Sequence, residues 1–173
     1  MRSSAIAMAA AALFVVGAAA FFVFSGSGSR IVCTVRIHRE IGDVFEFFTT
    51  PKNWPQWHPA SISVARATDH SLAVGEEVGE EFRVGSGKAH TVWRVTAREA
   101  PHLWQIENAP TEDARVTITY RLHTDGRDTV FERDMQYQFN RLRLRVLDPI
   151  FIRRHMERES QQAVMNAKDI LEG

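Results

Sequence analysis

Glu80 and Arg133 are the two ionisable residues of this sequence that occupy apolar surroundings in a predicted strand. Glu80 alternates with Val78 and Phe82, and Arg133 likewise stands between apolar residues at every second position. Because successive side chains of a strand point to opposite faces, both charges are expected on the inner face of a sheet. An isolated buried charge is costly. We therefore expect these residues to pair with each other, to contact a polar ligand group, or to lie at a solvated end of the sheet.

Two tyrosines fall on the same predicted inner face, and their hydroxyl groups are suited to orient a carbonyl group or to donate a proton. The alternative for each is ordinary aromatic packing, with the hydroxyl group bonded to a neighbour. If the protein is an enzyme, its catalytic candidates are therefore Tyr120, Tyr137, Arg133 and Glu80.

Metal chemistry and cofactor chemistry find no support in the sequence. The seven histidines form no H-x-x-x-H or H-E-x-x-H pair, and phosphate-loop, dinucleotide and nucleophile-elbow motifs are missing. His58 is the one histidine to test, because two tryptophans precede it. The single cysteine, Cys33, excludes an intrachain disulfide and is expected to be a small buried hydrophobic residue. We expect neither a metal nor a cofactor.

Composition limits the class of protein further. The 173 residues carry 21 basic and 21 acidic side chains, and this balance argues against nucleic-acid binding, which needs a basic excess. Hydrophobic residues make up 45% of the chain, enough to form a folded core.

The N-terminal segment 1–24 is predicted to be a membrane anchor. Residues 5–24 are apolar without interruption, and a helix of that length rises roughly 30 Å, the thickness of the hydrocarbon core of a bilayer. A cleaved signal sequence is the alternative. Residues 25–29, Ser-Gly-Ser-Gly-Ser, are a flexible linker, and a globular domain is expected over 30–173. The protein is therefore expected at a membrane through one N-terminal span, and the sequence leaves open on which side.

The globular part reads as one strand, short helices, a run of strands and a long helix. The first strand covers 31–37, and apolar residues at helical spacing predict a short helix over 40–49. Residues 51–59 contain three prolines and predict a turn with two aromatic anchors. Six strands follow, over 61–67, 76–84, 88–98, 103–108, 115–124 and 129–139, with short turns that favour antiparallel neighbours.

A long terminal helix is predicted over 150–171. Asp148 is expected as its N-cap and Pro149 in its first turn. Its inward face is expected to carry the following apolar and small residues: Ile152, Met156, Ser160, Ala163, Ala167 and Ile170.

This order, with Val44-Phe45 in the first helix and Asn53-Trp54-Pro55-Gln56-Trp57-His58-Pro59 in the turn, resembles the polyketide cyclase/dehydrase and lipid-transport superfamily, the START-like helix-grip (SRPBCC) proteins. The resemblance covers 30–172. It implies an α+β fold, in which a curved antiparallel β-sheet wraps around a long C-terminal helix, here preceded by an N-terminal transmembrane helix. It also implies an apolar cavity between sheet and helix, and hence a hydrophobic small molecule or lipid as ligand. Because the superfamily holds carriers, sensors and cyclases, membership does not imply catalysis.

The residues expected to line that cavity follow from strand alternation, from the aromatic turn and from the small residues of the terminal helix. Packing alone is the alternative for the turn tryptophans. The predicted ligand-binding residues are Trp54, Trp57, Phe82, Trp93, Trp104, Tyr120, Phe131, Arg133, Met135, Tyr137, Met156, Ser160 and Ala163.

A basic strip lies between residues 141 and 158, where six arginines stand against two acidic residues. Beside a membrane it is suited to bind anionic headgroups, and the alternative is a solvated surface. Three hypotheses remain open: a membrane-anchored domain that binds a hydrophobic small molecule or lipid, a cofactor-independent cyclase or dehydratase acting in the same cavity, and a domain without a cavity that binds lipid or protein.

Overall fold

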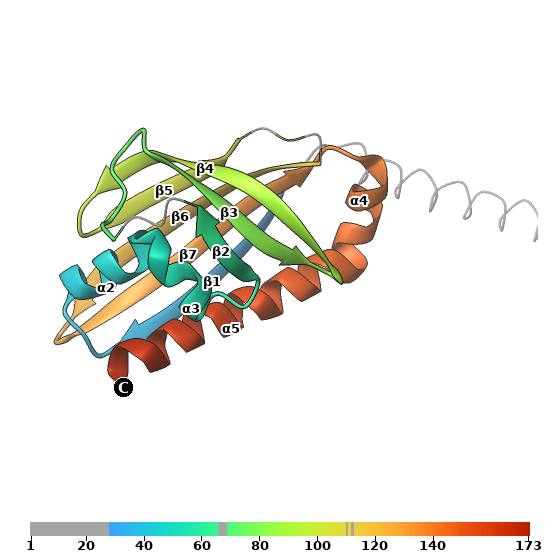
Figure 1. Cartoon of the computed structure of the whole chain (residues 1–173). Coiled ribbons are helices and arrows are strands. Elements are labelled where there is room, and N and C mark those ends of the chain that lie inside the picture. The colour runs from blue at the N-terminus through green and yellow to red at the C-terminus, as the bar shows by residue number, and fades with distance from the viewer. Residues whose placement is uncertain (1–27, 66–68, 110, 112) are drawn as a thin grey trace, which may run out of the picture.

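A single curved sheet with helices against its inner face forms the described part of the protein. The computed structural model describes residues 28–65, 69–109, 111 and 113–173. Seven antiparallel strands lie in the order β1-β7-β6-β5-β4-β3-β2. Figure 1 shows this sheet curving over α2 and α3, while α5 runs alongside β1. The predicted helix-grip arrangement is confirmed.

The strands agree with the sequence-based prediction to within one or two residues at the described ends. They are β1 (Ser29–Ile37), β2 (Ser61–Ala65), β3 (Glu77–Val84), β4 (Gly87–Glu99), β5 (Leu103–Asn108), β6 (Ala114–Asp125) and β7 (Asp128–Phe139). β1 begins at Ser29, which the sequence had placed in the linker. Burial alternates along β1 and through the middle of β4, as expected for strands with one face on the core.

The aromatic turn folds into two short helical pieces after α2 (Ile41–Thr49), the predicted amphipathic helix. A single 3₁₀ turn, η1 (Pro51–Asn53), leads into the one-turn helix α3 (Trp54–Trp57). The prolines at the start of each piece are tolerated because the first backbone N–H groups of a helix have no intrahelical acceptor. These pieces place both tryptophans in the core.

The C-terminal helical region differs from the prediction. It begins with α4 (Leu142–Leu147), widens into a π-helix, η2 (Asp148–Ile152), and continues as α5 (Arg153–Glu172). Asp148 is not an N-cap, because its own backbone is helical and its carboxylate accepts hydrogen bonds from Ser29 and Tyr137. The π-turn contains Pro149, which has no N–H group for the regular ladder.

The inward face of α5 is made of Ser160, Ala163, Val164 and Ala167. Ile170 was predicted on this face, but 43% of it is exposed, because the inward face continues from Ala167 by four residues to Leu171, which packs on the core instead.

The predicted membrane span, 5–24, lies outside the described residues. Among the residues that the structure does describe, no helix combines the length and the apolar character needed to cross a bilayer.

Candidate functional site

A buried arginine lies at the centre of the concave face. Arg133, on β7, is only 3% exposed, and its Nη1 donates to the hydroxyl of Ser160 on α5 at 3.0 Å. Its Nη2 faces the sulfur of Met135 at 3.7 Å, and its Nε has no partner. Within the described residues, Arg133 forms no ion pair with any carboxylate. A buried guanidinium group with so few acceptors is unusual, because a charge without a counter-charge is expensive to bury.

Glu80 lies near this arginine without touching it. The indole N–H of Trp93 on β4 donates to Glu80 Oε2 at 2.7 Å. Burial raises the pKa of Glu80 above its usual value, although hydrogen bonds from Ser61 and Trp93 and the positive charge of Arg133 act in the opposite direction. The two predicted inner-face charges therefore share one interior without forming a direct pair.

Tyr120 and His58 complete the polar cluster around Arg133. Burial raises the pKa of Tyr120 to about 12, although the charge of Arg133 and a hydrogen bond with its guanidinium group act in the opposite direction. Burial, and then the same charge, lowers the pKa of His58 to about 3, so its imidazole is neutral at physiological pH. His58 Nδ1 accepts the backbone N–H of Ala60 at 3.3 Å.

Tyr137 is engaged elsewhere. Its hydroxyl donates to Asp148 Oδ1 at 2.6 Å and so ties β7 to η2. Burial and the bond to Asp148 raise the pKa of Tyr137. The structure therefore brings Glu80, Arg133 and Tyr120 together and assigns Tyr137 to the junction between sheet and helix.

The predicted aromatic lining residues divide into two groups. At one end of the interior, Phe48 of α2 stacks on Phe131 with ring centroids 3.7 Å apart, and Trp57 packs against its edge at 5.1 Å. The indoles of Trp54 and Trp104 belong to the same buried core. This end is densely packed by aromatic side chains. Phe48 was not predicted as a lining residue, although its place on the apolar face of α2 could have indicated it.

The second group surrounds the other half of the interior, where fewer large side chains lie. Ser160 and Ala163 present small buried side chains from α5, while Phe82 and Met156 remain partly exposed. Thr91 lies opposite Glu80 in the β3–β4 register, and its buried hydroxyl lacks a partner. Trp93 and Met135, both buried, share this half. Two buried polar atoms without partners, Thr91 Oγ1 and Arg133 Nε, therefore lie on the same side of the interior as the small residues of α5.

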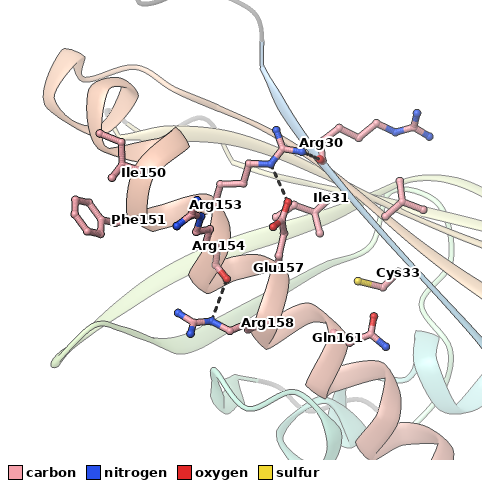
Figure 2. A pocket seen from close by; sticks show the side chains of 11 residues that line it. Arg30, Ile31, Cys33, Ile150, Phe151, Arg153, Arg154, Glu157, Arg158 and Gln161 are labelled. Atoms are coloured by element: carbon pink, nitrogen blue, oxygen red, sulfur yellow. Dashed lines mark hydrogen bonds and ion pairs between the residues drawn. The ribbon is translucent and has the colours of Figure 1, made fainter.

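An open groove of about 980 Å³ lies between the edge strand β1 and the C-terminal helices. Figure 2 shows its walls, which are Arg30, Ile31, Val32 and Cys33 of β1, Ile150 and Phe151 of η2, and Arg153, Arg154, Glu157, Arg158 and Gln161 of α5. No predicted ligand-binding residue lines this groove. Its wall residue Cys33 pairs with Arg133 in the β1–β7 register, so the groove lies one strand away from the buried guanidinium. The alternation of β1 and the basic strip were the sequence signals for this groove.

A family model described as polyketide cyclase / dehydrase and lipid transport matches residues 30–172. No curated protein matches the sequence. Among solved structures, the ginseng major latex-like protein 151 from Panax ginseng is 12% identical, with a TM-score of 0.64 over 84% of this chain and 99% of that one. Protein TTHA0849 from Thermus thermophilus is 9% identical, with a TM-score of 0.67 over 83% and 97%. Protein CV1439 from Chromobacterium violaceum is 14% identical, with a TM-score of 0.65 over 83% and 97%. At these identities the structures support the fold alone.

Proposed function

Because the chain belongs to the polyketide cyclase/dehydrase and lipid-transport family, we propose that it binds a hydrophobic small molecule or lipid between the concave face of its sheet and α5. The ligand lies against the half of the interior lined by Phe82, Trp93 and the small residues of α5. Arg133 binds a polar group of this ligand. The domain works without a cofactor.

The observation that carries this proposal is the incomplete bonding of Arg133. A guanidinium group has five N–H donors, and here the hydroxyls of Ser160 and Tyr120 and one weakly accepting sulfur face them, while Nε has no partner. Buried donors in folded proteins nearly always have partners, so such a group indicates a water molecule or a ligand. A carbonyl or carboxylate group of a ligand supplies the acceptors that Nε and Nη2 lack. The unpartnered hydroxyl of Thr91 offers a second bond.

We also propose that residues 5–24 anchor the domain to a membrane and that residues 25–29 act as its linker. The uninterrupted apolar sequence of this segment supports the proposal. A carrier held at a membrane would exchange its ligand with the bilayer and would not diffuse through solution together with that ligand.

Glu80 favours a second candidate function. Burial raises the pKa of Glu80 and so favours its protonated form more than in an exposed glutamate, and Glu80 lies near the Arg133 charge and the hydroxyl of Tyr120. Such a group fits a cyclase or dehydratase that polarises a carbonyl group with Arg133 and moves a proton with Glu80.

The ligand can be identified directly. Residues 28–173 contain every described strand and helix, so this domain is to be purified without detergent, weighed by native mass spectrometry and extracted with solvent. The proposal expects a stoichiometric apolar molecule with a polar head, lost from Arg133→Met and retained by the matched variant Arg98→Met. An empty wild-type domain that also takes up no apolar probe contradicts it. Conversion of the identified ligand, abolished in Glu80→Gln, favours the enzyme instead.

A further inference from the structure

The α4–η2 segment exposes a broad apolar surface. Five large side chains within ten residues are between 43% and 66% exposed: Leu142, Val146, Leu147, Ile150 and Phe151. We call this set the α4–η2 surface. Single exposed apolar residues are common, but a contiguous group of this kind marks a surface that binds a partner.

Unpaired positive charges surround this surface. Arg143 and Arg145 lie on α4, and Arg154 and Arg158 lie on the first two turns of α5. Within the part of the chain that the structure describes, none of these four forms an ion pair. The nearby carboxylate of Asp148 does not offset them at the surface, because it is buried and bonded to Tyr137. The surface therefore combines exposed apolar groups with a net positive rim.

The chain enters the fold beside this surface. Ser29, the first residue of β1, donates its hydroxyl to Asp148 of η2, and Arg153 Nη2 lies 3.4 Å from the carbonyl oxygen of Arg30. Only four residues, 25–28, separate Ser29 from the apolar sequence 5–24. Fully extended, four residues span roughly 14 Å. If residues 5–24 lie in a bilayer, the α4–η2 surface is held close to the lipid headgroups of that bilayer.

We propose that the α4–η2 surface docks on an anionic membrane, with Ile150 and Phe151 inserted at the boundary between headgroups and acyl chains. The four unpaired arginines lie at the level of the lipid phosphates. Amphipathic surfaces bind membranes in this way, through apolar burial together with attraction to anionic lipids. Ile150, Phe151, Arg154 and Arg158 also line the groove beside β1 (Figure 2), so docking places the open side of that groove at the lipid surface.

The test uses the full chain reconstituted in vesicles. An environment-sensitive fluorophore is attached to Leu147→Cys in a Cys33→Ala background, in phosphatidylcholine vesicles with and without phosphatidylserine. We expect a blue-shifted emission and protection from an aqueous quencher that depend on phosphatidylserine and weaken at high salt. A probe at Val74→Cys, a residue 59% exposed in the loop before β3, reports no such change.

Variants separate docking from other causes. Arg154→Gln with Arg158→Gln is expected to weaken the phosphatidylserine response at least tenfold, since each basic residue near an anionic surface contributes roughly fivefold. The matched variant Arg127→Gln, in the exposed β6–β7 turn, leaves it unchanged. Three results overturn the proposal: equal probe spectra in both vesicle types, a response that follows protein density rather than lipid charge, as a second copy would give, or a response that survives loss of both arginines. Because the fluorophore reports on lipid contact at residue 147, the test does not depend on whether a ligand is bound in the interior.

Discussion

Replacement of Arg133 by methionine tests the central reasoning about the interior. Methionine keeps much of the length of arginine and removes its charge. Burial of an uncompensated ion costs several kcal/mol after relaxation, and a hydrogen bond from a charged group such as the one to Ser160 offsets about 1.5–3 kcal/mol of that cost. Without ligand, Arg133→Met is therefore expected to raise the free energy of unfolding by about 1–3 kcal/mol.

Urea and thermal unfolding of residues 28–173, followed by circular dichroism, measure this change. For a domain of this size, 1 kcal/mol corresponds to about 2–4 °C in Tm, so a rise of about 2–12 °C is expected. Ligand affinity should move in the opposite direction. Loss of a charge-assisted hydrogen bond of about 1.5–3 kcal/mol weakens binding roughly 10- to 150-fold. Stability gained together with affinity lost is the signature of a group placed for a ligand.

Arg98→Met is the matched control. The guanidinium group of Arg98 lies 5.3 Å above the ring of Phe45, and its Nη2 lies 3.7 Å from Glu46 Oε1. Its loss is expected to lower the free energy of unfolding by about 0.5–1.5 kcal/mol. If Arg133→Met destabilises the domain as much as Arg98→Met, Arg133 is a satisfied structural residue and the reasoning fails.

Three further predictions concern bonds and protons. Tyr137→Phe leaves the buried carboxylate of Asp148 without one donor and should lower the free energy of unfolding by about 1–2 kcal/mol in urea titration; an unchanged midpoint contradicts the tie between β7 and η2. Because the folded-state pKa of Glu80 is raised, folding should weaken as pH rises from about 4.3 through that pKa, and Glu80→Gln should remove this slope; a slope that persists assigns it to another group. Burial acts to raise the pKa of Asp134, but hydrogen bonds from Arg30 outweigh it, and the folded-state pKa is lowered. The stabilisation that Asp134 contributes is therefore present above about pH 4 and is lost as pH falls through its folded-state pKa. An acid unfolding transition of Asp134→Asn identical to that of the wild type refutes this.

The strands were predictable because their signal is local. Alternation of apolar residues gave six of the seven strands to within two residues at both ends, and β2 at its described end, and placed Tyr120 and Arg133 on the inner face. The helix α2 followed from its apolar spacing in the same way. Assigning residues to a face of a strand requires only the two-residue period of side-chain direction, and this period can be followed in the sequence itself.

The start of the C-terminal helix was predicted wrongly for a physical reason. Asp148 and Pro149 are typical of a helix start, yet the carboxylate bonds to Ser29 and Tyr137, both more than ten residues away along the chain. These tertiary bonds leave Asp148 inside a continuous helical region with a π-turn. The local sequence predicts an N-cap role for Asp148, but its carboxylate instead accepts hydrogen bonds from distant donors that only the folded sheet brings near.

The sequence determined that two charges face a shared apolar interior, that small residues of the terminal helix lie beneath it, and that a basic strip follows the last strand. Only the tertiary structure decided that Glu80 and Arg133 do not pair, because the separation of β3 and β7 depends on how the sheet curves. It also decided that a groove opens between β1 and α5, since that requires the first strand to lie at the sheet edge beside the last helix. Composition and period are local properties of a chain, whereas a site is made by residues that meet through the packing of distant elements.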